Sequence, residues 1–110
     1  MAISQGLTTL FKKNLLEADI NFSTAQIKMA LVKNTANIGP ETTSYSELGS
    51  EEVSGGSYVS GGNVLSATVA TSGTTAYVDF ADSSWSTVTF TTAGALIYNG
   101  ASPYDAIAVL

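Results

Sequence analysis

Hydrophobic and polar residues follow the clearest strand patterns in the C-terminal third of the chain. Residues 77–80 and 88–91 alternate, which places Val78, Phe80, Val88 and Phe90 on one face of a sheet. Residues 95–98 and 106–110 are apolar throughout and are separated by turn residues. Strands without alternation are expected where both faces of a sheet are covered. This third of the chain therefore predicts a hairpin in the middle of a β-sandwich.

Near the N-terminus, apolar residues with helical spacing predict one α-helix over about residues 5–18. Ser4 is the expected N-cap, and Asn14 lies away from the centre of the apolar stripe. The stripe residues are Leu7, Leu10, Phe11, Leu15 and Ala18, widened by Leu16. Such a helix packs either on its own sheet, the interpretation we favour, or against a partner.

Between these regions, residues 26–33 alternate as a strand and residues 34–62 lose regular pattern. A single helical turn is expected at residues 45–48, and Leu65, Ala67 and Val69 alternate on a further strand. The glycine pairs at 55–56 and 61–62 predict turns rather than a phosphate cradle, because no lysine follows them. The whole chain, residues 1–110, is expected to form a mainly β, single-domain β-sandwich, Ig-like or jelly-roll-like, with one N-terminal α-helix and a long loop region at 34–62.

Composition narrows the chemistry that this chain can perform. The 110 residues are 45% hydrophobic and 12% charged, and they include no cysteine and no histidine. Disulfides, zinc fingers, thiol nucleophiles and histidine-based catalysis are therefore excluded. The closely spaced acid pairs, Asp79 with Asp82 and Glu51 with Glu52, supply too few ligands for a calcium loop. We expect no enzymatic activity, no metal site and no cofactor.

The net charge of −5 is unevenly distributed along the chain. All four cations, which are lysines, lie within the first 33 residues, and residues 34–110 hold seven of the nine acids. Four lysines beside a long acidic remainder argue against nucleic-acid binding, which needs a basic patch. The acids either keep a β surface soluble or mark an end that faces a different partner. Without a signal peptide or an apolar run of 18 residues, we expect no membrane association.

Residues 34–62 are the expected partner-binding segment, because binding surfaces sit preferentially on loops carried by a rigid scaffold. The candidate contact residues are Tyr45, Glu47, Glu51, Glu52 and Tyr58. The alternative is that this segment only covers one end of the core. A small domain with few charges to divide its apolar surface also predicts self-association.

The order of motifs along almost the whole chain resembles a family of small virion structural proteins of tailed bacteriophages. The motifs are residues 7–16, 21–23, 27–32, 51–55, 61–62, 79–82, 89–91 and 95–99, together with Tyr58, Leu65 and Trp85. The resemblance implies a capsid decoration (cement) protein that assembles in the host cytoplasm, binds the major capsid protein or another virion protein on the capsid surface, and forms a homotrimer. It offers no catalytic residue.

Two other functions stay open beside the decoration protein. One is a tail, neck or fibre component of the same particle. The other is a carbohydrate-binding β-sandwich module, for which exposed aromatic rings are needed. Its candidate aromatic residues are Tyr45, Tyr58, Trp85 and Tyr104.

Overall fold

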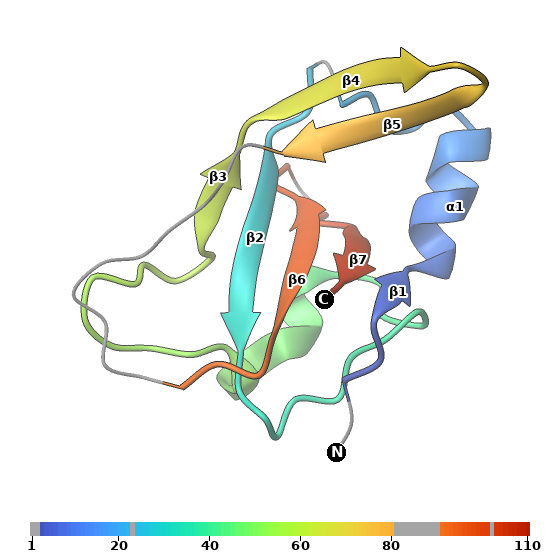
Figure 1. Cartoon of the computed structure of the whole chain (residues 1–110). Coiled ribbons are helices and arrows are strands. Elements are labelled where there is room, and N and C mark those ends of the chain that lie inside the picture. Colours follow the sequence, from blue (N-terminus) through green and yellow to red (C-terminus); the bar gives the residue numbers. More distant parts are fainter. Residues whose placement is uncertain (1–2, 23, 81–90, 102) are drawn as a thin grey trace.

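The computed structural model describes residues 3–22, 24–80, 91–101 and 103–110, and within them the protein is mainly β, as the sequence predicts (Figure 1). The elements in chain order are β1 (Gly6–Leu7), α1 (Thr9–Leu16), β2 (Ile27–Val32), the 3-10 helix η1 (Tyr45–Glu51), β3 (Asn63–Leu65), β4 (Ala67–Ser72), β5 (Thr75–Phe80), β6 (Gly94–Asn99) and β7 (Ala106–Val109). The expectations for Asp82, Trp85, Val88 and Phe90 fall outside the described residues.

The strands form two antiparallel sheets. The larger has the order β1-β7-β6-β2-β3, and β4 pairs with β5 as a separate two-stranded sheet. Residues 95–98 of β6 and all of β7 are buried, which confirms that the uninterrupted apolar runs are covered on both faces. Figure 1 shows the β4–β5 hairpin running across the end of the five-stranded sheet towards α1.

Each face of the five-stranded sheet has its own core. The loop-side core lies under residues 34–48 and comprises Ala30, Val32, Ala36, Ile38, Leu48, Leu96, Tyr98, Ala106 and Val109. The helix-side core comprises Phe11, Ile27, Leu65, Ile97, Ile107 and Ala108, with Ile20, Phe22, Met29 and Phe80 packed against it. The period-2 alternation of β2 explains the split, because successive side chains point to opposite faces.

The predicted helix is shorter than the sequence suggested, and its start was wrong. Thr8, not Ser4, is the N-cap: its hydroxyl accepts a hydrogen bond from Phe11 N at 3.1 Å. Gly6 and Leu7 instead pair with β7 and cover an edge that would otherwise leave backbone groups unpaired. The helix ends at Leu16 rather than near residue 18.

The apolar stripe of the helix is only partly buried, which is a second correction. Phe11 is 6% exposed, whereas Leu7, Leu15 and Leu16 are 49%, 49% and 89% exposed. Asn14, which we expected away from the packed face, is only 8% exposed. Its side-chain amide donates to Asp105 Oδ2 at 3.0 Å. The helix thus packs on its own sheet through a narrower stripe, with a polar contact to the loop before β7.

An irregularity in β7 explains how the N-terminal segment is attached. Ile97 pairs with Ala108 and Tyr98 with Ala106, so Ile107 is one extra residue, a β-bulge. Two carbonyls at the bulge accept bonds from the N-terminal segment: Thr8 N donates to Ile107 O at 2.9 Å, and the Thr8 hydroxyl donates to Ala106 O at 2.8 Å. The bulge therefore fixes the start of α1 on the sheet.

The alternating stretch at Leu65, Ala67 and Val69 is divided between two sheets. Leu65 ends β3 in the five-stranded sheet, and Ala67 begins β4 in the hairpin. In β5, Val78 and Phe80 are the less exposed residues, as their alternation predicts. The Phe80 ring meets Phe22 edge to face with centroids 6.1 Å apart, which links the hairpin to the helix-side core.

Candidate functional site

Residues 34–62 form an ordered cover over the loop-side core and build the polar cluster described next. The 3-10 helix η1 starts at Tyr45, where the sequence predicted one helical turn. Glu47 secures its start by accepting bonds from both the backbone and the hydroxyl of Thr43. The Thr43 hydroxyl bond, with the backbone bonds of Thr43 and Ser44, holds the pKa of Glu47 below its ordinary value.

Glu52 is the centre of the cluster, because donors from three parts of the segment converge on its carboxylate. Tyr45 and Tyr58 donate their hydroxyls to Oε1 and Oε2, each at 2.5 Å, and Gly61 N donates to Oε2 at 2.7 Å. The Ser60 hydroxyl donates to Oε1 at 3.3 Å. Hydrogen bonds to a charged acceptor are among the stronger ones in proteins, so this carboxylate holds the segment together.

The tyrosines around Glu52 connect the cover to the sheet. The Tyr58 hydroxyl accepts from Leu31 N of β2 at 3.0 Å, and Tyr45 stacks on Tyr98 of β6 with centroids 4.6 Å apart. Burial, and then the bond to Glu52, raises the pKa of both Tyr45 and Tyr58. Burial also raises the pKa of Tyr98, whose hydroxyl donates to Gly61 O at 2.7 Å. These phenols therefore serve as hydrogen-bond donors near neutral pH.

Gly62 permits this close approach of the cover to β2. Its φ is +81°, and an added Cβ would lie 1.7 Å from the carbonyl oxygen of Met29. Only glycine combines that backbone conformation with that distance. The second glycine pair is therefore a backbone turn, as the sequence predicts, and it has a steric reason beyond the turn itself.

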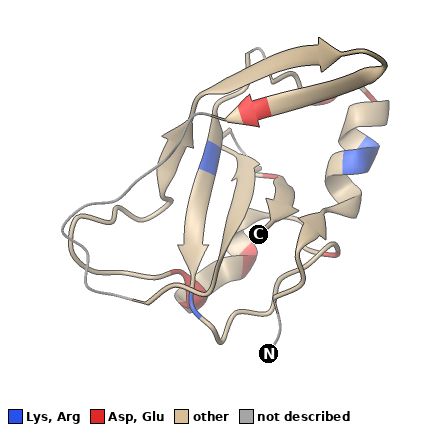
Figure 2. Cartoon of the chain, viewed as in Figure 1, with Lys and Arg blue, Asp and Glu red and all other residues tan. Residues whose placement is uncertain are grey.

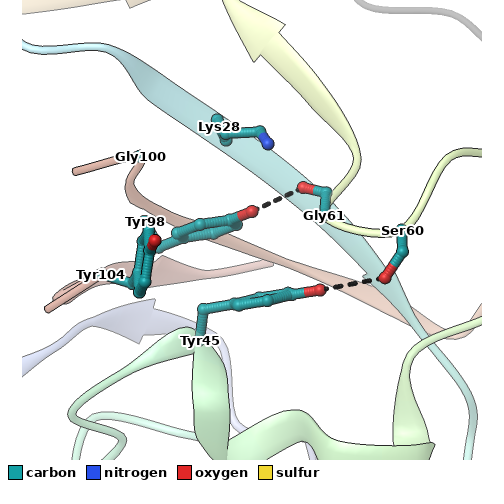
Figure 3. Close-up of a pocket in the computed structure, with 7 residues that line it drawn as sticks. All are labelled: Lys28, Tyr45, Ser60, Gly61, Tyr98, Gly100 and Tyr104. Atoms are coloured by element: carbon teal, nitrogen blue, oxygen red, sulfur yellow. Dashed lines mark hydrogen bonds between the residues drawn. The ribbon is translucent and has the colours of Figure 1, made fainter. Parts of the chain in front are cut away.

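Beside the cluster, a pocket of about 280 Å³ opens between the cover and the ends of β2 and β6 (Figure 3). It is lined by Lys28, Tyr45, Ser60, Gly61, Tyr98, Gly100 and Tyr104. Lys28 comes from β2 and faces Tyr98 across the strand pair. Tyr104 lies in the loop before β7 and is 42% exposed. Aromatic walls with a few polar groups are typical of small-molecule sites.

Tyr104 has an unusual backbone conformation at the rim of the pocket. Its φ is +64°, a left-handed value that is uncommon for residues other than glycine. Two bonds hold it there: Tyr104 N donates to Ala101 O at 2.8 Å, and Tyr104 O accepts from Tyr45 N at 3.0 Å. Non-glycine residues held in such conformations cluster at ligand sites, so this geometry marks the rim as a candidate site.

The residues expected to bind a partner separate into two groups. Tyr45, Glu52 and Tyr58 come together in the cluster, and Tyr58 is only 8% exposed. Glu47 instead secures the start of η1, and Glu51 accepts the Thr35 hydroxyl at 2.6 Å on the exposed surface. Their contact with a partner stays a prediction. The structure adds that Tyr58 and Glu52 hold the fold together.

Several pocket residues had no signal in the sequence. Lys28 looked like an ordinary outward residue of an alternating strand, and Tyr98 looked like part of an apolar run. Only the antiparallel pairing of β2 with β6 brings the two together. Tyr104 was a candidate aromatic residue for carbohydrate binding, and it shares the pocket with Tyr45.

The charged side chains of the described residues do not form a metal site. Lysines lie on α1, on β2 and just beyond it, while acids are spread over the loops, η1 and β5 (Figure 2). Within residues 3–22, 24–80, 91–101 and 103–110, no three acids come close enough to hold a metal ion. In the same part of the chain, no helix has the length and apolar character needed to cross a membrane.

Comparisons of the chain with protein-family models, with curated proteins and with solved structures find no match.

Proposed function

We propose that this protein is a non-enzymatic structural component of a bacteriophage particle, a capsid decoration protein that binds the major capsid protein and stabilises the head. The setting rests on the resemblance of its motif order to small virion proteins. Its two antiparallel sheets then form a sandwich-like body, with α1 and residues 34–62 as covers. The protein is located on the capsid surface as a homotrimer, after assembly in the host cytoplasm.

One observation carries the structural role: the densest polar cluster of the described chain is used to hold its own fold. Four donors saturate the Glu52 carboxylate, and two of them are tyrosines with raised pKa values. A general base or nucleophile needs a group that is free to react. A carboxylate tied to four donors, in a domain without histidine or cysteine, suits a stabilising protein instead.

Binding of the purified protein to particles stripped of it tests this proposal. We expect saturable binding to the head at a fixed number of copies, with a rise in the temperature at which the head disassembles. Cryo-EM of the source particle gives the position directly. Density at the tail, neck or fibres, with bare heads, would replace the decoration role with the alternative virion role.

A second candidate, carbohydrate binding, is favoured by one specific observation. Two of the aromatic residues expected for such a role, Tyr45 and Tyr104, line the same pocket. Binding of immobilised glycans by the purified protein tests this candidate separately from the particle experiment.

A further inference from the structure

The pocket beside the Glu52 cluster is lined by one cation, Lys28, that pairs with no acid in the described part of the chain. Lys28 is half-buried, and among the described residues its ammonium makes no ion pair or hydrogen bond. The Glu52 carboxylate of the neighbouring cluster accepts bonds from Tyr45, Tyr58, Ser60 and Gly61. A half-buried lysine without an ion pair gains a charge-assisted hydrogen bond from an anion that comes from outside.

Two glycines keep space for this side chain and for a ligand. A Cβ on Gly61 would lie 3.1 Å from Lys28 Nζ and 3.3 Å from the Tyr98 hydroxyl. A Cβ on Gly100 would lie 3.1 Å from Lys28 Cδ and 2.8 Å from Gln26 O. Lys28 therefore passes between two positions without side chains, and its ammonium lies at the pocket, as Figure 3 shows.

The size and walls of the pocket indicate more than a simple anion. Its volume of about 280 Å³ lies near the lower end of the range that is usual for small-molecule sites, about 300 Å³. One carboxylate side chain would leave most of that space to water, whereas the pocket has room for a pyranose ring. The half-exposed Tyr104 ring at the rim offers an aromatic face to the C–H groups of such a ring.

We propose that this pocket binds an acidic sugar unit, of the uronic acid class, whose carboxylate pairs with Lys28 while its ring packs against Tyr104. This inference rests on the second candidate function, carbohydrate binding, and adds the charge of the ligand and the residue that recognises it. The Tyr98 and Ser60 hydroxyls are the additional polar groups that the sugar hydroxyls can reach.

The test is an NMR titration of the ¹⁵N-labelled protein with three probes. Glucuronate has the ring and the carboxylate, glucose has the ring alone, and N-acetylglutamate has carboxylates without a sugar ring. We expect glucuronate to give saturable shifts at the amides of Lys28, Gly61, Gly100 and Tyr104, with clearly weaker effects from the other two probes.

Substitutions connect these shifts to the proposed contacts. Lys28→Met keeps the aliphatic length and removes the charge, so it should weaken glucuronate binding about tenfold or more. Tyr104→Asn removes the ring but tolerates the left-handed backbone, and should weaken binding severalfold. Lys12→Met removes the same charge from the exposed side of α1 and should leave the affinity unchanged. The amide spectrum of each variant shows directly whether it folds.

Each other outcome overturns the proposal in a distinguishable way. If glucose bound as tightly as glucuronate, carbohydrate binding would be supported, but recognition of a carboxylate by Lys28 would be contradicted. N-acetylglutamate binding as tightly would make the pocket a socket for acidic side chains of a protein. Glucuronate binding at wild-type strength to a folded Lys28→Met variant, or no saturable shift at the four amides, would remove the acidic-sugar site altogether.

Discussion

The two faces of the five-stranded sheet are covered in physically different ways. On one face, residues 34–62 are held by hydrogen bonds that converge on Glu52 and by the stacked pair Tyr45–Tyr98. On the other, α1 and the β4–β5 hairpin are held through Phe11, Phe22 and Phe80, which meet edge to face. The stability of the first cover depends on the geometry of hydrogen bonds to a charged carboxylate. The stability of the second depends on the amount of apolar surface removed from water.

This difference determines which substitutions each face should tolerate. A directional cluster is sensitive to exchanges that keep the shape of a side chain and change its hydrogen bonding. An apolar contact is sensitive to lost volume and tolerates exchanges that preserve it. The predictions below use pairs of substitutions to separate the two kinds of cover.

Gly62→Ala should have the largest effect and should detach the loop-side cover. The new Cβ would lie 1.7 Å from Met29 O on strand β2, at a φ of +81°. We expect the free energy of unfolding to fall by at least about 4 kcal/mol, measured by chemical denaturation. Gly73→Ala is the matched control, because its φ is +60° and nothing lies within 4 Å of its Cβ. It should cost only about 1 kcal/mol, and equal losses in the two variants would contradict a steric cause.

Phe11→Ala should be next, with a loss of about 3 kcal/mol in the free energy of unfolding. Phe11 is 6% exposed and contacts the Phe22 ring at a centroid distance of 5.7 Å. Phe11→Leu retains most of the volume and should cost less than about 1.5 kcal/mol. Leu16→Ala, at a side chain that is 89% exposed, should change stability by at most about 0.5 kcal/mol. A loss from Phe11→Leu as large as that from Phe11→Ala would mean that this cover also depends on geometry.

Glu52→Gln should cost about 2 kcal/mol although it preserves the shape of the side chain. The amide has one acceptor oxygen in place of two, so its NH₂ group would face a donor on one side of the cluster. Glu51→Gln is the neighbouring control, because the Glu51 carboxylate accepts the exposed Thr35 hydroxyl and lies outside the cluster. It should cost about 0.5 kcal/mol or less. Equal stability of the two variants in denaturation curves would show that the Glu52 carboxylate does not hold residues 34–62 in place.

The smallest expected effect is a loss of stability in alkaline solution that depends on the loop-side cover. In the folded protein, burial and then the bond to Glu52 raise the pKa of Tyr58. In the unfolded chain, tyrosines titrate at a pH of about 10. Above that pH the unfolded chain binds fewer protons than the folded one, so stability falls as the pH rises and is fully present below it.

Tyr58→Phe should make this alkaline slope shallower by about 1 kcal/mol per pH unit. The measurement is the free energy of unfolding at several pH values on both sides of 10. Phe11→Leu lowers stability without removing a titratable group, so it should keep the wild-type slope. An unchanged slope in Tyr58→Phe would show that its phenol does not titrate differently in the two states.

The start of α1 shows why helix boundaries were hard to read from the chain. Ser4 was the expected N-cap, and the apolar residues from Leu7 onward fit helical spacing. Gly6 and Leu7 form a strand and not the first helical turn, because the edge of β7 and a carbonyl at its bulge offer backbone partners. Those partners lie about a hundred residues further along the chain, so the local sequence pattern around residues 4–8 could not indicate them.

The candidate site was predictable only in part, and for a related reason. An irregular, glycine-rich segment with two tyrosines and two adjacent glutamates was recognisable as special, and Tyr45, Glu52 and Tyr58 do meet there. Which glutamate receives the tyrosines was not readable, because Glu51 and Glu52 are neighbours with the same chemistry. The isolated pairing of Glu52 with Val32 sets Glu52 beside β2, where its carboxylate meets both tyrosines, while the Glu51 carboxylate accepts the exposed Thr35 hydroxyl.

The sequence by itself determined the class of structure: alternating and uninterrupted apolar runs set which residues are strands and which of those are covered twice. It also determined the missing chemistry, since a chain without histidine and cysteine lacks their reactions wherever it folds. The tertiary structure alone decided the division of residues 63–72 between two sheets and the meeting of Lys28, Tyr98 and Tyr104 at one pocket. Periodicity is a local property of the chain, whereas strand order, register and a bulge depend on residues far apart in sequence.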